Sequence, residues 1–313
     1  MRSVMSIHVY IRCPAITEND SKDHCQGSNL CSPISHTERI PTTSNHSFLT
    51  PSSLTNPFEM AARKLLVVGA TGKQGGSLIE ALSTILPPFK IIALTRDTAS
   101  SAKPLASRPN ITIREGDFSQ PSPFFASHKD IYGVLSMAMP RTKVSEEDQA
   151  KPLIDESIKY GVNHFVFTSV DRGGEASDKT PTDIHHVATK HLIEHYLKEQ
   201  TSRSGSKMQW TILRLVAFFY NMTPDFMGKG FASMWAGVGS KPIQLISSRA
   251  VGLFAAKAFP KPDKFQGKAI SLAGDESTLV QARKVFRETL GYDMPETFGV
   301  VGKGIEFAVG RLG

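Results

Sequence analysis

Apolar residues occur along much of the chain in short continuous runs, separated by stretches in which they recur every three or four positions. Leu65–Val68 is the first clear run, and two of its four residues are β-branched, which indicates a strand buried on both faces. Runs of this kind then alternate with helical patterns, as in a parallel sheet covered by helices on both faces. The expected strands are 65–68, 90–95, 111–115, 131–136, 164–168, 209–215 and 268–272, and the expected helices are 73–86, 146–160, 183–199, 249–258, 277–290 and 301–312.

This pattern divides the chain into three parts. Residues 1–59 are rich in Ser, Thr, Pro, Asn and His without sustained periodicity, so we expect a disordered leader. Met60-Ala61-Ala62-Arg63 stands immediately before the first strand and would itself make a natural start, so the leader is interpreted as an upstream extension without a structural role. Residues 60–215 predict a Rossmann-type, doubly wound parallel sheet of the α/β class, and residues 216–313 predict a smaller α/β lobe on the substrate side.

Three glycines follow the first strand at a regular spacing. Gly69 permits a tight turn, Gly72 permits a close approach of the backbone to a pyrophosphate, and Gly75 permits the next helix to lie against the strand. The N-terminus of that helix offers free N–H groups and a positive dipole end to phosphates. Because strand, turn and helix come in the required order, the stretch predicts a dinucleotide site rather than a purely structural turn.

The sequence Gly-Ala-Thr-Gly-Lys-Gln-Gly-Gly at 69–76 resembles that of the NmrA-like family, a group of atypical short-chain dehydrogenase/reductases. Residues 267–276 and 294–299 also resemble this family, so that the resemblance covers about 64–313. It implies that Thr71, Lys73 and Gln74 contact the dinucleotide together with the glycines. Relatives usually continue beyond the equivalent of Gly313, so the resemblance also implies a truncated chain with an incomplete second lobe.

The end of the second strand bears on the choice of dinucleotide. NAD-selective proteins usually have an acidic residue there, whereas Arg96 can pair with the 2′-phosphate of NADP. The neighbouring Asp97 keeps NAD open as the alternative. Asp117, after the third strand, is either an acceptor for the adenine amino group, as in related folds, or a turn-forming residue.

Positions at the ends of the fourth and fifth strands belong at the nicotinamide end of such a site. Ser136 and Met137 end the fourth strand, and Thr168 and Ser169 end the fifth. The aromatic-rich stretch 216–222 resembles the family loop that closes over the nicotinamide, which makes Asn221 a candidate for contact with cofactor or substrate. Most aromatic residues of this stretch serve equally well as core.

The helix expected at 183–199 carries the candidate catalytic residues. Reductases of the wider superfamily have Tyr-x-x-x-Lys there, on one helix face. Lys190 is present, but His186 occupies the tyrosine position, a departure typical of NmrA-like proteins, many of which are regarded as dinucleotide-sensing regulators. Catalysis remains open, because an imidazole can act as an acid or base near neutral pH and some relatives are thought to use the lysine without a tyrosine.

The same helix contains a zinc-protease-like pattern, His191-x-x-Glu194-His195. It lies inside a Rossmann βα unit and has no marked third ligand, so we expect a solvated helix face and no metal. All three cysteines, Cys13, Cys25 and Cys31, lie in the leader, which fits a reducing compartment, the cytoplasm or the nucleus.

The formal net charge is +7, and the basic excess is scattered. This suits an anionic cofactor better than direct nucleic-acid binding. No apolar run is long enough to span a membrane. Together with Arg96, the resemblance to the NmrA-like family implies an NADP(H)-binding regulator that acts through a protein partner. The alternatives are an NADPH-dependent reductase using Lys190 and an inert paralogue.

Overall fold

The computed structural model describes residues 10–11 and 62–296, except 85–88, 97, 99–102, 141, 181 and 204. The predicted helix 301–312, residue Asp97 and nearly all of the leader lie outside the described residues. Tyr10–Ile11 (β1) is the exception within the leader, because it pairs with an edge strand of the main sheet.

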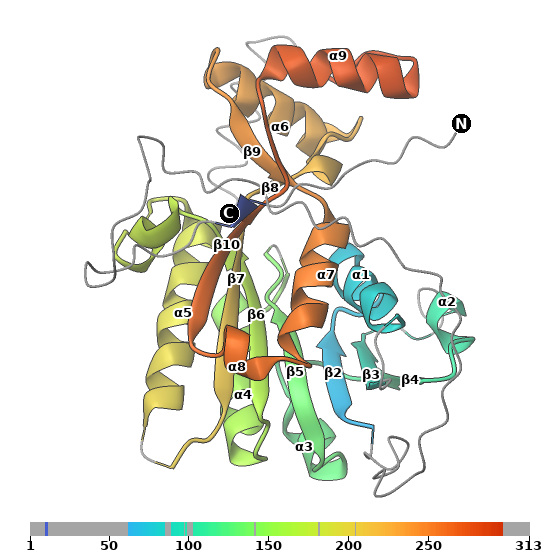
Figure 1. The fold of residues 1–313 in the computed structure, drawn as a ribbon, viewed down its shortest axis with the longest axis vertical. Coiled ribbons are helices and arrows are strands. Elements are labelled where there is room, and N and C mark those ends of the chain that lie inside the picture. The colour runs from blue at the N-terminus through green and yellow to red at the C-terminus, as the bar shows by residue number, and fades with distance from the viewer. Residues whose placement is uncertain are drawn as a thin grey trace, which may run out of the picture.

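Eight of the described strands form one sheet in the order β1-β10-β7-β6-β5-β2-β3-β4 (Figure 1). All neighbouring strands run parallel except β1, which is antiparallel to β10. The order reverses at β2, which lies between β3 and β5, so a ligand crevice is expected at the carboxyl ends of β2 and β5. The doubly wound α/β fold is thereby confirmed. The further strands are β2 (Lys64–Val68), β3 (Lys90–Thr95), β4 (Ile111–Glu115), β5 (Ile131–Met137), β6 (His164–Val170), β7 (Gln209–Leu215) and β10 (Lys268–Ala273).

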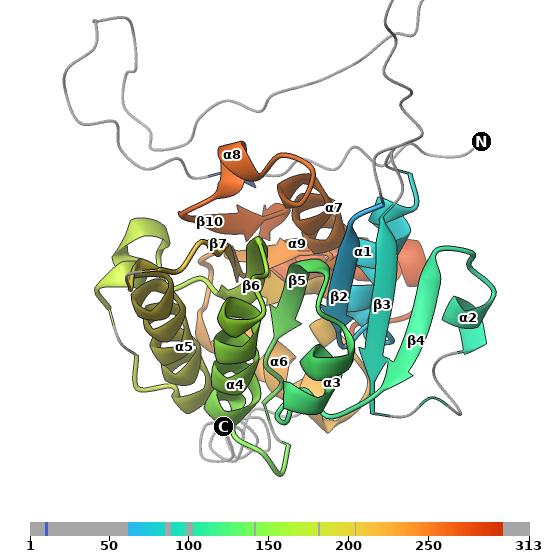
Figure 2. The same cartoon turned by 90° about the horizontal axis from the view of Figure 1, so that it is seen from below.

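Alternate residues of each strand enter two different cores, one on each face of the sheet. In β2, Leu65 and Val67 pack toward α1 (Lys73–Leu82) and α7 (Ser248–Ala258), whereas Leu66 and Val68 pack on the opposite face. That second face is covered by α3, α4 and α5, as Figure 2 shows from below. Burial on both faces explains why these strands have continuous apolar runs. The three helices are α3 (Ser122–Ser127), α4 (Glu146–Lys159) and α5 (His185–Ser202).

Helices α1 and α7 cross at very short range on the first face. A Cβ atom at Gly252 of α7 would lie 2.4 Å from the carbonyl carbon of Ser77 and 2.7 Å from the backbone nitrogen of Leu78. Only a glycine therefore permits this contact. The crossing therefore fixes the position of α1 at Ser77 and Leu78.

The described part of the second lobe is built from two segments, 217–246 and 275–296, which we call the small lobe. It stands above the carboxyl edge of the main sheet in Figure 1. Single residues join it to the main sheet and to α7: Val216 after β7, Ser247 before α7 and Gly274 after β10. Trp235 and Leu245 lie at the centre of its own apolar cluster. Its elements are β8 (Ala217–Phe218), α6 (Phe226–Gly237), β9 (Ile243–Ile246), β11 (Asp275–Ser277) and α9 (Leu279–Leu290), and its sheet has the order β11-β9-β8.

The predicted strands of the main sheet agree with the structure to within two residues at each end. The helix predicted at 183–199 begins at His185 and ends at Ser202. The strands of the small lobe, α3 and α6 were not predicted, nor were the two short helices α2 (Lys103–Ala106) and α8 (Pro262–Phe265). Among the described helices, none has the length and apolar character needed to cross a membrane.

Candidate functional site

The glycine turn after β2 has the geometry that its spacing predicts. Gly69 has a φ of 63°, in the left-handed region, and its carbonyl accepts the Gly72 N–H at 2.9 Å. A Cβ at Gly75 would lie 2.5 Å from the Gly69 oxygen and 2.8 Å from the Ala70 Cα, so no side chain fits there. The turn therefore brings the first residues of α1 directly against the end of β2.

The N-terminus of α1 is suited to an anion. Gly72 is its N-cap, and among the described residues no side chain caps this end and no acidic residue occupies the first turn. Thr71, Gly72 and Lys73 are exposed, while Gln74 is half-buried. Free backbone N–H groups, the dipole and the Lys73 charge all favour phosphate oxygens at this point. The residues therefore fit a pyrophosphate.

Arg96 and Asp117 lie at the ends of the neighbouring strands β3 and β4. Both are exposed, and the Arg96 guanidinium lies 6.0 Å from the ring centroid of Phe118. Asp117 accepts hydrogen bonds from the Ser119 backbone at 2.9 Å and from its hydroxyl at 2.7 Å, through the same carboxylate oxygen. Asp117 thus forms a turn of the kind that the alternative interpretation predicts.

The end of β5 adjoins the glycine turn. A Cβ at Gly69 would lie 3.0 Å from the Met137 sulfur, so that Met137 packs beneath the turn. Ser136 and Thr168 are both buried. By register, Met137 lies beside Thr168 and Ser136 lies beside Phe167, so Ser136 is on the sheet face that α5 covers.

Lys190 reaches the same edge from α5. Its side chain is 8 % exposed, its ammonium donates a hydrogen bond to the Ala138 carbonyl and lies 5.6 Å from the Phe167 ring centroid. The ammonium also lies 3.5 Å from the Glu146 carboxylate. Burial lowers the pKa of Lys190, while the Glu146 charge raises it in part. His186, one helical turn earlier, is half-buried.

The loop after β7 covers the start of α1. The Tyr220 ring stacks on Phe218 at 4.4 Å, and the Lys73 ammonium lies 5.0 Å from its centroid. Burial raises the pKa of Tyr220, and a hydrogen bond with Gln74 acts in the opposite direction. Asn221 follows at the end of the 3₁₀ turn Phe219–Asn221 and is half-buried. This loop and the glycine turn are therefore in direct contact.

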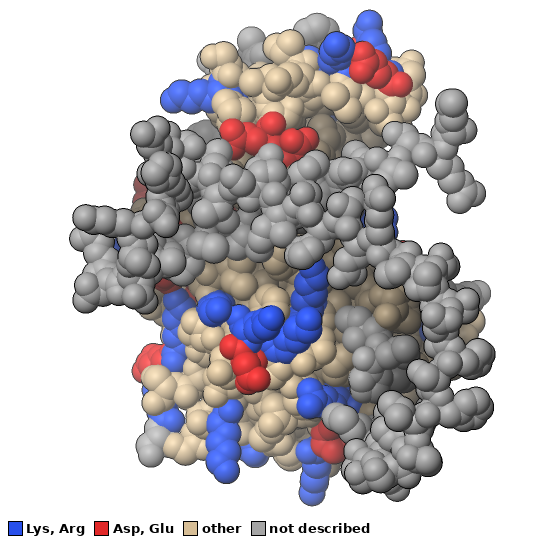
Figure 3. All heavy atoms as spheres, viewed as in Figure 1, with Lys and Arg blue, Asp and Glu red and all other residues tan. Residues whose placement is uncertain are grey.

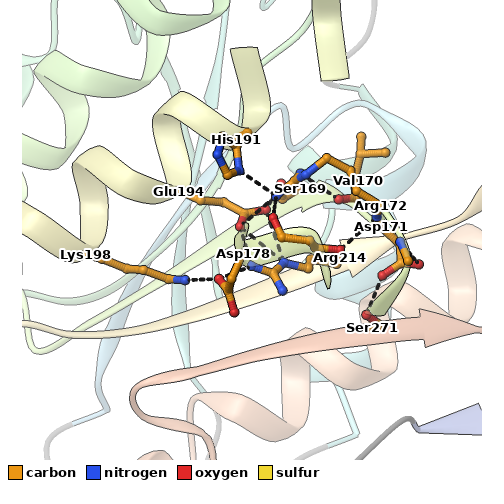
Figure 4. Close-up of polar contacts among 12 residues, drawn as sticks. Ser169, Val170, Asp171, Arg172, Asp178, His191, Glu194, Lys198, Arg214 and Ser271 are labelled. Carbon is orange, nitrogen blue, oxygen red and sulfur yellow. Dashed lines mark hydrogen bonds and ion pairs between the residues drawn. The ribbon is translucent and has the colours of Figure 1, made fainter. Parts of the chain in front are cut away.

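Ser169 takes part in a buried charge network instead of facing this edge (Figure 4). Its hydroxyl donates to Glu194, whose carboxylate also binds Arg214 at 2.6 Å and Arg172 at 3.2 Å. Arg214 also binds Asp178 at 2.6 Å. Burial opposes ionisation of Asp178, but hydrogen bonds from Arg214 and Lys198 outweigh it and lower its pKa to about 2.

This network connects α5 to the strands of the main sheet that it covers. It links α5, the 3₁₀ turn Gly174–Asp178 and β7, and Asp171 extends it to β10 through a 2.5 Å hydrogen bond from Ser271. The Ser169 hydroxyl is thus bound within this network, and its role at the nicotinamide end stays a prediction.

The zinc-like pattern on α5 is also explained by the network. Glu194 is 1 % exposed and binds two arginines, so the predicted solvated face is wrong at this residue. Arg172 donates a hydrogen bond to His191 Nδ1 at 3.2 Å. Within the described ranges, no group of three His, Cys, Asp or Glu residues has metal-binding geometry.

Lys and Arg side chains occur at several separate places on the face shown in Figure 3, with Asp and Glu beside some of them. The described surface in this view has no single continuous basic stripe. This distribution resembles a general solvated surface.

Two residues of the site were not found from the sequence. Glu146 stands directly after the helix cap Ser145, where an acidic residue is ordinary, so nothing marked it as a partner of Lys190. Phe118 carried no signal beyond its position next to Asp117. Only the contact between elements distant in sequence reveals either role.

Residues 61–301 match the model of the NmrA-like family. The chain belongs to the NmrA-like family. This membership agrees with the glycine turn, the strand order and the position of Lys190 described above. The expectation that the chain ends early finds no support in the comparisons.

Curated relatives include an NmrA-like family domain-containing oxidoreductase, lnaB, of Aspergillus flavus, 27 % identical over 56 % of this chain and 52 % of that protein. The chain spans about half the length of that relative. Quinone oxidoreductase 2 of Escherichia coli is 23 % identical over 69 % of this chain and 71 % of that protein.

Among solved structures, the negative transcriptional regulator NmrA in complex with NADP has a TM-score of 0.61 at 18 % identity, over 79 % of this chain and 80 % of that one. Triphenylmethane reductase of Citrobacter sp., complexed with NADP(H), has a TM-score of 0.60 at 18 % identity, over 80 % and 88 %. At these identities the likeness supports the fold.

Proposed function

We propose that this chain is an NADP(H)-binding member of the NmrA-like family, whose bound dinucleotide changes its affinity for a protein partner in the cytoplasm or nucleus. The observation that carries the proposal is the turn at Gly69–Gly75. It holds the uncapped N-terminus of α1 against β2, at distances that exclude a side chain at Gly75. A pyrophosphate is the group that such a turn accommodates.

Each part of the dinucleotide has a counterpart among the described residues. The pyrophosphate lies at the backbone of Gly72 and Lys73, the adenosine end near Arg96 and Asp117, and the nicotinamide end between Met137 and the loop that ends at Asn221. Arg96 favours the 2′-phosphate of NADP, because a guanidinium forms forked, charge-assisted hydrogen bonds with phosphate. Lys190 holds the ribose next to the nicotinamide. The signal is the redox state of the bound dinucleotide, NADP⁺ or NADPH.

The sensing role follows from what stands one turn before Lys190. His186 replaces the tyrosine that serves as proton donor in reductases of this superfamily. General acid catalysis contributes about 10²–10⁴-fold, so the loss of that tyrosine leaves slow chemistry at most. Binding without rapid turnover is the result.

A reductase is the second candidate, and the position of Lys190 favours it. The ammonium lies at the end of β5, where the nicotinamide end of the dinucleotide is expected. Relatives named as oxidoreductases are consistent with such a role. In that case Lys190 orients the ribose and polarises a substrate oxygen with or without His186.

Calorimetric titration with NADP⁺, NADPH, NAD⁺ and NADH tests the proposal. We expect NADP⁺ and NADPH to bind more tightly than NAD⁺ and NADH. The affinity of the protein for its protein partner should differ between the NADP⁺-bound and the NADPH-bound form. If none of the four dinucleotides binds, both candidates are refuted and an inert paralogue is favoured.

Turnover separates the two candidates. NADPH absorbance is followed with a panel of aldehydes, ketones and quinones, using wild type, Lys190→Ala and His186→Ala. The sensing role predicts rates well below about 1 s⁻¹, the lower end of usual enzymatic rates. Sustained turnover above that value, abolished in Lys190→Ala, would establish the reductase instead.

A further inference from the structure

Glu146 is the feature of the site that the proposed function leaves unexplained. It is the first residue of α4, after the N-cap Ser145, and its side chain is 6 % exposed. Within the described part of the chain, neither of its carboxylate oxygens accepts a hydrogen bond. The Lys190 ammonium, at 3.5 Å, is its one ion-pair partner among the described residues.

The other acidic residues of this helix turn are placed quite differently. Glu147 forms an ion pair with Lys151 on the same helix, and its side chain is 29 % exposed. Asp148 is exposed and accepts a hydrogen bond from Ser145. Both are ordinary residues of a helix N-terminus. Glu146 alone of the three turns into the protein, where burial of a carboxylate without hydrogen bonds is costly.

We propose that Glu146 is a positioning residue, whose carboxylate keeps the Lys190 ammonium charged and fixed at the edge of the dinucleotide site. This inference rests on the proposed function only for the identity of the ligand. The pairing of the two side chains is a property of the protein alone.

The donor geometry of Lys190 shows how this positioning acts. An ammonium has three N–H donors. One is bonded to the Ala138 carbonyl, and the Glu146 carboxylate attracts the ammonium as an ion-pair partner at 3.5 Å, so donors remain for a ligand hydroxyl. The carbonyl and the carboxylate together fix the ammonium, whereas Lys190 without Glu146 would be held at one point only.

The charges around the pair are few. Glu146 is faced from α5 by Lys190 and by His185, and Lys190 is faced by Glu146 and by the ring of Phe167. Burial raises the pKa of Glu146, and Lys190 lowers it in part. Since burial lowers the pKa of Lys190 and Glu146 counteracts this, removal of the carboxylate lowers the pKa of Lys190 further.

The first measurement needs no ligand. The free energy of unfolding is compared for wild type, Glu146→Gln and the control Glu147→Gln between pH 6 and pH 9.5. A lysine with a lowered folded-state pKa binds more protons when unfolded, so its protein gains stability as pH rises. The deficit of Glu146→Gln against wild type should shrink across this range, whereas that of Glu147→Gln should stay constant.

A second variant covers the case in which Glu146→Gln does not fold. Glu146→Gln combined with Lys190→Met buries no charge, so this double variant should be more stable than Glu146→Gln alone. Two results would overturn the proposal and leave Glu146 a structural residue. One is a loss of stability in Glu146→Gln that does not depend on pH. The other is a double variant whose loss of stability equals the sum of the losses from the two single substitutions.

The second measurement is NADPH affinity at pH 6.5 and pH 8.5. In Glu146→Gln, binding should weaken about tenfold more at pH 8.5 than at pH 6.5, the difference between a charge-assisted and a neutral hydrogen bond. Glu146→Asp should restore most of the affinity. Equal losses at both pH values would contradict the role in positioning. If wild type binds no dinucleotide, the proposed function fails, while the ligand-free measurement still decides the pairing.

Discussion

Arg96 is the residue on which the choice between the two dinucleotides depends. Its exposed guanidinium at the end of β3 has room to form two charge-assisted hydrogen bonds with a 2′-phosphate. Such a contact contributes about 1.5–3 kcal/mol, so Arg96→Ala should weaken NADP⁺ binding about ten- to a hundredfold and leave NAD⁺ almost unchanged. Calorimetric titration of both ligands measures the difference.

The matched control is Arg108→Ala. Arg108 is equally exposed, but it lies in the loop before β4, at the amino ends of the strands. The Arg108→Ala substitution removes the same charge far from the proposed phosphate. The affinities for NADP⁺ and NAD⁺ should therefore both stay as in wild type. A parallel loss of NAD⁺ affinity in Arg96→Ala would mean that Arg96 contacts another part of the ligand.

His164 predicts the response of the protein to acid. It is fully buried at the start of β6, where Thr211 donates to the Phe265 carbonyl and so accepts from His164 Nε2 at 2.8 Å. Its Nδ1 has no partner among the described residues. Burial lowers the pKa of His164 from 6.5 to about 4, so the unfolded chain binds more protons between these values. The contribution of neutral His164 to the free energy of unfolding is therefore fully present above pH 6.5 and is lost as the pH falls toward 4.

That loss amounts to about 3 kcal/mol, at about 1.4 kcal/mol per pKa unit. His164→Gln keeps an amide donor near Thr211 but cannot be protonated, so its stability should fall less between pH 7 and pH 4.5 than that of wild type. Chemical denaturation at both pH values measures this. The control His195→Gln, at an exposed position, should behave as wild type, and identical acid sensitivity in all three proteins would refute the argument.

At the residue scale, the sequence was informative where one residue type has a special backbone role or a fixed place in a motif. Gly69 and Gly75 were predicted with their functions, and Lys190 with its position. The hydrogen bond of Ser169 to Glu194 was not predicted, because strand position alone does not reveal a partner on a distant helix. Glu146 was missed for the same reason. Buried polar pairs depend on contacts that no local pattern records.

The crossing of α1 and α7 is the main prediction at the scale of elements. A Cβ at Gly252 would meet backbone atoms of Ser77, which cannot rotate away. Gly252→Ala should therefore push the helices apart and cost about 1–3 kcal/mol, the usual cost of overpacking. Because α1 carries the proposed phosphate site, NADP⁺ affinity should fall as well.

Gly76→Ala is the control for this substitution. Gly76 lies in α1, and a Cβ there would be 3.7 Å from the Ala70 oxygen, an ordinary contact. Its alanine variant should be as stable as wild type or up to about 1 kcal/mol more stable. Thermal unfolding of both variants decides, and a Gly252→Ala protein as stable as wild type would show that the helices adapt freely.

Among the elements, the buried strands of the main sheet were predicted well and those of the small lobe were not. β2, β3 and β5 are covered on both faces, which produces unmistakable apolar runs. β8 and β11 have two and three residues, too few for any periodicity. Helix α6 was hidden because its sequence is rich in glycine and aromatic residues rather than in helix formers.

The whole molecule is held together mainly by the two cores of the large sheet. The small lobe has a separate and smaller apolar cluster around Trp235, and several apolar side chains of α6 and α9 remain exposed, among them Phe226 and Val280. Local stability follows buried apolar contact, so the small lobe should open more easily than the sheet. Native-state hydrogen exchange should show β9 amides exchanging at lower denaturant than those of β5 and β6. Exchange of all three strands in one step would contradict this.

The single-residue connections at Val216, Ser247 and Gly274 also determine the order in which the chain can fold. The strands β8 and β11 are continuations of β7 and β10, and β9 lies between them. The strand β9 can pair with both β8 and β11 only after β7 and β10 have brought these two strands together. We therefore expect the small lobe to fold late, and a fragment excised from it to remain unfolded.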